Sequence, residues 1–404
     1  MSRARAVPVL AATFVVTLLV FPWSDERVTD LNVYRFDASY FLHGQIPYRD
    51  VLFEYPPLAA PVIGLPGLAG TDYPTYQLAF AALMLAAGVA VLLLTGALAR
   101  STGGDERRAL AVVALAPLAT GAMIGNHFDL APVALTLAAL VLLVRARPVA
   151  GMAVLGLAVA TKGFPIVVAP VALAWFVARG EWRQALRGGA TLAAVCAVAV
   201  GGTIAISPSG ALDTWRWQTA RPVQVESIPA VALRALGGTR HVKSNRADGI
   251  VHPASGPVTG AVAMLGLAAV ALLAAGVARR PGPRELVLGS LAAVAAFATF
   301  GKVISPQYLV WTLPLAALAL AWRRHALFGV LAGATLLTFV EFPARYSAVV
   351  HGVPAAVALV AVRDALLVAA VALSARDLLA GYAARGATGA GVSASRARAT
   401  TSSP

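Results

Sequence analysis

The sequence has few of the residues on which most soluble enzymes depend. Only 12% of its 404 residues are charged, 59% are hydrophobic, and there is one cysteine. That cysteine, Cys196, lies within an apolar run, which excludes a disulfide framework and a cysteine-based metal site. The mean hydropathy of +0.77 is too high for a single water-soluble core. The composition therefore predicts a protein that folds in the lipid bilayer.

Motifs of several common enzyme chemistries are also missing. The sequence has no glycine-rich phosphate loop, no paired-histidine metal motif and no nucleophile elbow. We therefore expect no metal and no cofactor, and look for acid, base and amide chemistry at the membrane surface.

Acidic residues are scarce relative to basic ones, 18 against 32, and the net charge is +14. In a soluble protein this excess would suggest nucleic acid. Here the arginines fall in short loops between apolar runs, the pattern that orients membrane proteins. We therefore expect membrane lipids, and no nucleic acid, among the partners.

Long apolar runs are what the sequence has in quantity, and they predict an all-α, polytopic transmembrane protein of about 12 spans. The expected spans are residues 6–23, 76–99, 109–125, 128–144, 149–163, 164–178, 190–206, 257–278, 285–301, 306–322, 326–341 and 353–375. The first resembles a signal peptide, but Pro22–Asp25 offers no small-residue cleavage site, so we expect it to remain as a helix.

The distribution of arginine predicts the orientation in the cell membrane. Arginines of the short loops lie on the side of the N-terminus, which places both termini in the cytoplasm. Two long loops, residues 24–75 and 207–256, then face the extracytoplasmic side, where we expect the active site. Residues 1–378 form a single membrane domain, and residues 379–404 a disordered cytoplasmic tail.

The first long loop contains a helical pattern of polar residues. One face would carry Asp30, Tyr34, Asp37 and Phe41, and the other Val33, Phe36 and Tyr40. Asp30, at the start of this short helix, is either a partly desolvated base or a group that stabilises the positive end of the helix. Asp37, Asp50 and Glu54 are rival acids, but with Arg35 and Arg49 nearby each is more typical of a solvated or salt-bridged surface group.

Basic residues elsewhere are candidates for binding phosphate. Lys302 and Lys162 each follow an apolar run near the expected outer face, and each either contacts a phosphate or snorkels to the interface. The second long loop carries groups that suit a sugar and a lipid phosphate, or an interfacial belt: Trp215, Trp217, Arg221, Gln224, Glu226, His241 and Lys243. His127 and Asp129 do not make a metal site, and we interpret them as a loop cap.

Three short blocks resemble the GT-C superfamily of membrane glycosyltransferases that use polyprenyl-phosphate sugars. The first, Thr29-Asp30-x-x-Val33 with Asp37-Ala38, Gly44, Pro47-Tyr48 and Tyr55-Pro56-Pro57-Leu58, is similar to a loop of the first GPI mannosyltransferase and of the family 87 α-mannosyltransferases. The others are Lys302-Val303 with Gln307-Tyr308 and Trp311, and Gly156-Leu157-Ala158 with Lys162 and Pro165.

This resemblance implies an inverting hexosyltransferase that moves mannose from a polyprenyl-phosphate donor to a hydroxyl of a lipid-linked or glycan acceptor, in cell-envelope lipoglycan synthesis. By position, Asp30 would be the catalytic base, and Lys302, with Lys162 and Arg221, would bind the donor phosphate. The implied substrate-binding residues are Tyr34, Asp37, Tyr48, Glu54, Tyr55, Gln307 and Tyr308. Where the GPI enzyme has a second aspartate this chain has Asn32, which favours a metal-independent reaction.

Two alternatives remain open. A transferase of the same fold could move arabinofuranose or glucose, because sugar identity depends on hydroxyl contacts. A non-enzymatic flippase or transporter of lipid-linked sugars would show internal repeats and charged or broken helices near the midplane. The chain shows no clear repeat, and the ionisable residue well within an expected span is Arg363, next to Asp364.

Overall fold

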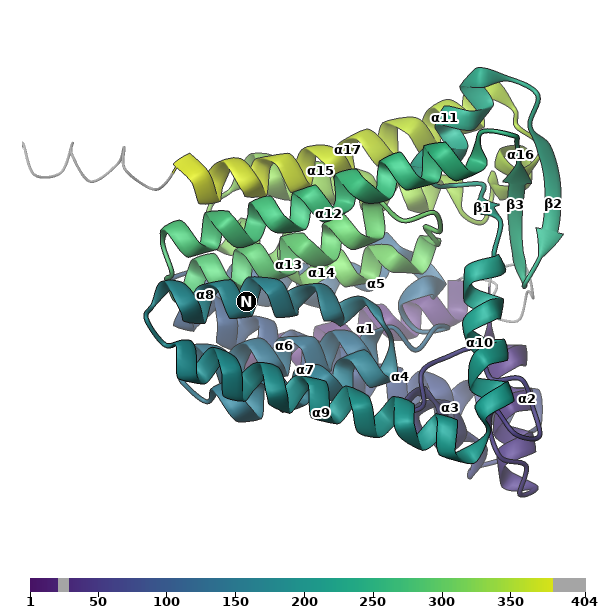
Figure 1. Cartoon of the computed structure of the whole chain (residues 1–404), viewed down its shortest axis with the longest axis horizontal. Coiled ribbons are helices and arrows are strands. Elements are labelled where there is room, and N and C mark those ends of the chain that lie inside the picture. The colour runs from purple at the N-terminus through teal and green to yellow at the C-terminus, as the bar shows by residue number, and fades with distance from the viewer. Residues whose placement is uncertain (21–28, 381–404) are drawn as a thin grey trace, which may run out of the picture.

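The computed structural model describes residues 1–20 and 29–380, and its main body is a bundle of helices (Figure 1). The bundle consists of α1 (Arg3–Val20), α4 (Tyr73–Ser101), α5 (Glu106–Thr120), α6 (Leu130–Val144), α7 (Pro148–Thr161), α8 (Val168–Ala178), α9 (Trp182–Ile206), α12 (Ser255–Arg279), α13 (Pro283–Thr299), α14 (Leu309–Ala321), α15 (His325–Glu341) and α17 (Pro354–Ala380). Each expected apolar run corresponds to one of these helices, which confirms the all-helical class. Residues 21–23 of the first run, residues 24–28 of the first loop and residues 381–404 of the expected tail lie outside the described residues.

The helices differ in length, and the difference matters for the site. Among the described residues, six helices are long and apolar enough to cross a membrane. At ~1.5 Å per residue, the 29 residues of α4 extend ~43 Å, whereas the 14 residues of α7 extend only ~21 Å. A helix as short as α7 does not cross the ~30 Å hydrocarbon layer by itself. The protein is therefore a polytopic membrane protein in which short helices hold polar loops within the length of the bundle. The number of crossings stays a prediction.

One end of the bundle collects the chain's N-terminus and several short, arginine-containing loops. The Met1 amino group donates to the Arg107 carbonyl at 3.1 Å. The Asp105 amide donates to the Ala321 carbonyl at 3.0 Å, and Arg324 pairs with Asp377 near the end of α17 at 3.2 Å. The short loops that the sequence predicts on the side of the N-terminus thus meet at one end. Which side of the membrane this end faces stays a prediction.

The opposite end carries the two long loops, and Figure 1 shows α2, α10 and the sheet gathered there. The first loop contains α2 (Leu31–Leu42) and α3 (Ala59–Gly67), and the second contains α10 (Pro208–Ala220), α11 (Ile228–Leu236) and the strands β1 (Val223–Gln224), β2 (Arg240–Ser244) and β3 (Ala247–Val251). The strands form an antiparallel sheet in the order β1-β3-β2, and α16 (Tyr346–Val350) lies nearby. The predicted helix at residues 30–41 is confirmed by α2.

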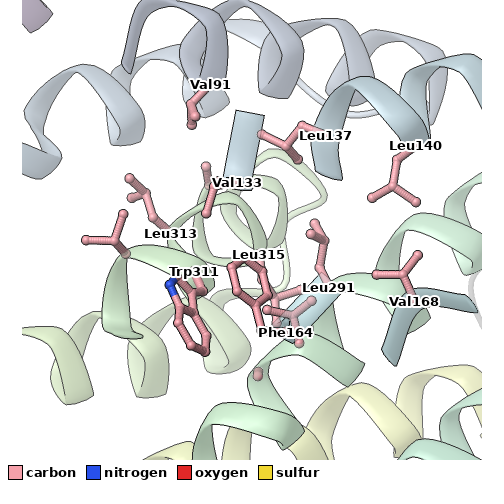
Figure 2. Close-up of a cluster of buried hydrophobic side chains, with 14 of the residues drawn as sticks. Val91, Val133, Leu137, Leu140, Phe164, Val168, Leu291, Trp311, Leu313 and Leu315 are labelled. Carbon is pink, nitrogen blue, oxygen red and sulfur yellow. The ribbon is translucent and has the colours of Figure 1, made fainter. Parts of the chain in front are cut away.

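The apolar core runs through the centre of the bundle, and Trp311 lies at its edge. Figure 2 shows the Trp311 ring among buried side chains that include Val133, Phe164, Leu313 and Leu315. The ring stacks on Phe164 with centroids 4.1 Å apart. Short 3₁₀ turns, η2 (Phe164–Val167) and η3 (Pro306–Tyr308), begin the helical segments that contribute these rings. The core thereby fixes one wall of the polar region described below.

A second polar region is sealed between the second loop and the bundle. We call Glu226, Glu341, Arg363 and Asp364 the buried cluster, since each side chain belongs to a residue no more than 4% exposed. The Arg363 Nε donates to Asp364 Oδ1 at 2.8 Å, and its Nη2 donates to the Glu226 carbonyl. The predicted proximity of Arg363 and Asp364 is therefore a true ion pair. Arg363 also joins α17 to the segment before α11.

Candidate functional site

Asp30 stands at the N-terminus of α2, where a carboxylate commonly caps the helix. It makes no cap bond, and the Thr29 hydroxyl instead accepts the Leu31 amide at 3.0 Å. The Tyr34 hydroxyl, one turn further along α2, donates to Asp30 Oδ2 at 3.3 Å. The Asp30 side chain is 40% exposed. Asp30 therefore makes no side-chain cap on α2, and its carboxylate is open to a ligand. Whether its charge stabilises the positive end of the helix stays an alternative.

His127 approaches Asp30 from the loop between η1 (Gly121–Ile124) and α6. Its Nε2 lies 3.5 Å from Asp30 Oδ2, and its Nδ1 lies 2.6 Å from Asn126 Oδ1. The imidazole is only 7% exposed. Burial lowers the pKa of His127, and the neighbouring charges of Asp30 and Asp129 partly oppose this effect.

Asp129 and Lys162 form a buried ion pair beside His127. The Lys162 Nζ donates to Asp129 Oδ1 at 2.7 Å, and the Trp311 indole donates to the same oxygen. The ammonium also lies 4.6 Å from the centroid of the Phe128 ring and 5.8 Å from that of Tyr308. The cap predicted for Asp129 is wrong, because its carboxylate turns inward to Lys162 and makes no cap bond. Lys162 likewise turns inward to its partner and does not snorkel.

Glu54 ties the two long loops together. Its Oε2 accepts from Arg221 at 2.6 Å and from the Trp217 indole at 3.0 Å, and its Oε1 accepts from Arg246 at 3.1 Å. Arg246 occupies the turn between β2 and β3, where Asn245 and Arg246 have φ of 51° and 57°. Left-handed conformations at both positions are typical of a type I′ hairpin turn, which aims Arg246 at Glu54. Glu54 is only 5% exposed, and its negative charge is paired with these two arginines.

Close backbone packing reinforces the same junction. A Cβ atom at Gly210, in α10, would lie 1.7 Å from the Tyr48 carbonyl oxygen. Only glycine fits at this contact, because any other residue would force the two segments apart. The Tyr48 hydroxyl donates in turn to the Tyr55 carbonyl at 2.7 Å. Helix α10 thus braces the segment that carries Glu54 and Tyr55.

A cavity of about 200 Å³ lies beside this junction. Its polar lining residues are Arg221, Lys302, Ser255 and Thr259, and the rest of its lining is Pro222, Val223, Ile250, Val251 and Gly256. We call it the basic cavity, because its charged lining residues are Arg221 and Lys302. The Lys302 Nζ donates to the carbonyls of Thr219 at 2.7 Å and Arg221 at 2.9 Å. Burial and the charge of Arg221 lower the pKa of Lys302. Since an ammonium has three donors, one remains for an anion in the cavity.

The aromatic residues Tyr55 and Tyr308 join the two parts of the site. Tyr308 interacts electrostatically with Asp30 and Asp129 on one side and with Arg221 on the other. The charges of Asp30 and Arg221 both act on Tyr55, and burial raises the pKa of Tyr55 well above the usual value. The Tyr34 and Tyr55 rings lie edge to face, 5.9 Å apart. Asp30 and Arg221, which lines the cavity, therefore act electrostatically on the same two tyrosines.

The residues predicted for substrate binding fall into two groups. Tyr55, Gln307 and Tyr308 are partly exposed, and Gln307 and Tyr308 lie in η3. Tyr34, Asp37, Tyr48 and Glu54 are instead buried. The pKa of Asp37 is raised to about 7, mainly by burial. These four residues support the site from behind.

Sequence reasoning missed the contact of His127 with Asp30 and the roles of Arg246 and Trp217 on Glu54. No local pattern connects these residues, since Trp217 lies 163 positions after Glu54. The Lys162–Asp129 pair had a usable signal, because a lysine held near the bilayer requires a partner and Asp129 is an acid at a similar depth. Among residues 1–20 and 29–380, no cluster of three or more His, Cys, Asp or Glu side chains is placed to hold a metal. A reaction without a metal stays a prediction.

Comparison with known proteins identifies a family. The sequence model of glycosyltransferase family 87 matches residues 53–306, more than half of the chain, and this range begins after Asp30. No curated protein sequence matches.

Solved structures with a similar course of the chain include the apo oligosaccharyltransferase of Archaeoglobus fulgidus, with 14% identity and a TM-score of 0.45. The match covers 93% of this chain and 56% of that one, so this chain spans about half the length of that enzyme. ArnT from Cupriavidus metallidurans, bound to undecaprenyl phosphate, matches with 18% identity and a TM-score of 0.43 over 93% of this chain and 77% of that one.

Proposed function

The chain belongs to glycosyltransferase family 87, and we propose that it transfers mannose from a polyprenyl monophosphate to a hydroxyl of a lipid-linked or glycan acceptor. In this proposal residues 1–378 form one membrane domain whose site opens on the extracytoplasmic side. The observation that carries the proposal is the position of Asp30, an exposed and uncapped carboxylate whose charge acts on the same tyrosines, Tyr55 and Tyr308, as that of Arg221 in the basic cavity.

Asp30 is the general base. A general base needs a carboxylate oxygen that faces solvent and is not paired with a cation. Among the described residues near Asp30, the one basic group within salt-bridge distance is His127, whose charged form is disfavoured by burial. Asp129 is held by Lys162, and Glu54 is held by Arg221 and Arg246. As the acceptor oxygen attacks the anomeric carbon, Asp30 takes the hydroxyl proton.

The basic cavity binds the donor phosphate. When the bond between the anomeric carbon and the phosphate oxygen breaks, its electron pair stays on the phosphate, whose charge grows. Lys302 and Arg221 stabilise that charge, since both line the cavity. The Lys302 ammonium keeps one of its three donors, and the Arg221 Nε has no partner among the described residues. Lys162 is paired with Asp129 and does not contact the phosphate in this proposal; its charge acts on the phosphate only at a distance. A base and a phosphate site on different sides of the sugar suit inversion.

Tyr55, Gln307 and Tyr308 contact the sugar in this proposal, and the buried Tyr34 orients Asp30 through its hydroxyl. Aromatic rings and amide groups at this position can pack on the sugar ring and bond its hydroxyls. Asp37, Tyr48 and Glu54 hold the loops that carry these residues.

The test is sugar transfer in membranes that contain the wild type, Asp30→Asn or Asp213→Asn. Asp213 is a matched control, because it is an exposed aspartate of α10 at the same end of the molecule. With radiolabelled polyprenyl-phosphate mannose, we expect wild type and Asp213→Asn to label lipid or glycan. Asp30→Asn should be slower by ~100-fold or more.

Each other result has a definite meaning. Label transferred from polyprenyl-phosphate arabinofuranose or glucose, and not from mannose, would show that the donor sugar is different and the type of reaction is as proposed. No transfer from any of these donors, together with movement of the labelled lipid across the membrane, would show that the protein is a carrier and not an enzyme. Full activity of Asp30→Asn would remove Asp30 as the base.

A further inference from the structure

Two side chains from distant parts of the chain meet at the proposed base, and only one of them is accessible. Asp30 Oδ2 and His127 Nε2 are 3.5 Å apart, with Asp30 40% exposed and His127 7% exposed. A substrate hydroxyl can therefore reach Asp30 and cannot reach His127. Whatever His127 does for the reaction, it does through Asp30.

The hydrogen-bond network assigns the tautomer of His127. Its Nδ1 is 2.6 Å from Asn126 Oδ1, an acceptor, so Nδ1 carries the proton. In the neutral imidazole, Nε2 then has only a lone pair. This lone pair faces the lone pairs of Asp30 Oδ2 at a distance longer than a normal hydrogen bond between nitrogen and oxygen. A proton placed between the two atoms would turn repulsion into a hydrogen bond.

The charges around His127 make its state depend on Asp30. Three charged groups act on the imidazole: Asp30 from α2, Asp129 from its own loop, and Lys162 from the end of α7. Asp129 and Lys162 neutralise each other in an ion pair of 2.7 Å. The remaining charge is that of Asp30, which favours an imidazolium, while burial favours the neutral ring. His127 is thus a neutral imidazole that can become an imidazolium when a proton arrives at Asp30.

We propose that His127 is a positioning residue that shares, and then holds, the proton that Asp30 takes from the acceptor hydroxyl. This inference rests on the proposed function. The acceptor oxygen forms its bond to the anomeric carbon and gives its proton to Asp30, and the phosphate leaves with the electron pair of the broken bond. The proton moves from Asp30 to His127 Nε2, which restores the carboxylate, and it returns through Asp30 to water after the product leaves.

A shared proton predicts a specific pH dependence. The pair has a higher affinity for a proton than a carboxylate alone would have, so activity on the acid side is lost at a higher pH in the wild type than in a chain without the imidazole. His127→Gln should keep an amide near the Nε2 position that donates to Asp30, but it cannot accept a proton. Its acid limb should move to lower pH by roughly one unit or more, and kcat should fall by ~10-fold or more with KM nearly unchanged.

The experiment measures kcat and KM against pH for the wild type, His127→Gln, Asp30→Asn and the double variant. His43→Gln is the matched control, because His43 is an exposed histidine at the other end of α2. Since the two side chains act as a unit, the double variant should be no slower than Asp30→Asn. Nitrogen NMR of labelled histidine should show a neutral His127 with its proton on Nδ1 at pH 7. If His127→Gln does not fold, His127→Asn takes its place.

The outcomes separate this inference from the proposed function. A fall in kcat with an unchanged acid limb would assign His127 a purely structural role and overturn the shared proton. Unchanged kinetics in His127→Gln, while Asp30→Asn is inactive, would also overturn it and leave Asp30 as a base acting alone. Full activity in Asp30→Asn would overturn the base, and the shared proton with it.

Discussion

The site around Asp30 and the buried cluster around Arg363 use the same residue types in opposite ways. Asp30 is 40% exposed and makes no cap bond, whereas Glu226 and Glu341 are no more than 1% exposed. Burial and the neighbouring Glu341 raise the pKa of Glu226 well above its usual value. In the buried cluster the acids therefore serve the fold, where burial disfavours their charged form. A carboxylate must keep contact with water, or a specific partner, to remain a base.

The same substitution should have opposite results in the two regions, and this is the largest effect that we expect. Asp30→Asn should lower transfer by ~100-fold or more and leave the melting temperature unchanged. Glu226→Gln should leave both nearly unchanged, because an amide has nearly the size and shape of the carboxyl and carries no charge for burial to disfavour. Transfer assays and thermal unfolding in detergent measure both. A large loss of activity in Glu226→Gln would mean that the buried cluster takes part in the reaction.

Removal of the cation from the buried cluster should mainly affect stability. Arg363→Met leaves Asp364 without its partner and frees the Glu226 carbonyl, and a broken buried pair typically costs ~3–5 kcal/mol. Arg376→Met is the control on the same helix, where the side chain is 67% exposed and little change is expected. Thermal unfolding measures the difference. Equal melting temperatures for the two variants would contradict a structural role for Arg363.

Lys302 should affect the donor more than the fold. Lys302→Met removes one charge from the basic cavity, and a hydrogen bond to a charged group is worth roughly 1.5–3 kcal/mol, so kcat/KM for the donor should fall by ~10-fold to 100-fold. Lys243→Met is the control, because Lys243 is an exposed lysine of β2 that does not line this cavity. Initial rates at varied donor concentration measure the change. Equal rates for both variants would show that the donor phosphate does not bind in this cavity.

Asp37→Asn should have the smallest effect on transfer, within a few-fold, and a distinct effect on stability. Burial raises the pKa of Asp37 to about 7, so the folded protein keeps this proton between about pH 4 and pH 7 while the unfolded chain loses it. Ionisation of the buried Asp37 therefore destabilises the folded protein. This destabilisation is absent at acid pH, increases as the pH rises and reaches its full value above pH 7. The melting temperature of Asp37→Asn should exceed that of wild type at pH 8 and converge with it near pH 4. A constant difference would contradict the burial of a protonated Asp37.

The sequence was sufficient for the helices and insufficient for the contacts between distant polar residues of the candidate site. Apolar runs longer than a turn identify helices because the bilayer forces the backbone to satisfy its own hydrogen bonds. The helical spacing of Asp30, Tyr34 and Asp37 likewise predicted α2, which is confirmed. What is bonded to Asp129 or Glu54 depends on how helices cross, and no local pattern carries that information. For this reason the cap at Asp129 was wrong, and the contact of His127 was not foreseen.

The long separations within the site also determine when it can exist during synthesis. Glu54 cannot pair with Arg221 until 167 further residues have been synthesised, and Asp129 cannot bond to Trp311 until 182 further residues have been synthesised. A nascent chain that has inserted only its first helices exposes Asp30 without the basic cavity, the Glu54 junction or the Trp311 wall. The catalyst is therefore completed only near the end of membrane insertion. A ribosome that stalls midway should leave an inert fragment in the membrane, with no partial transferase to modify the wrong lipid.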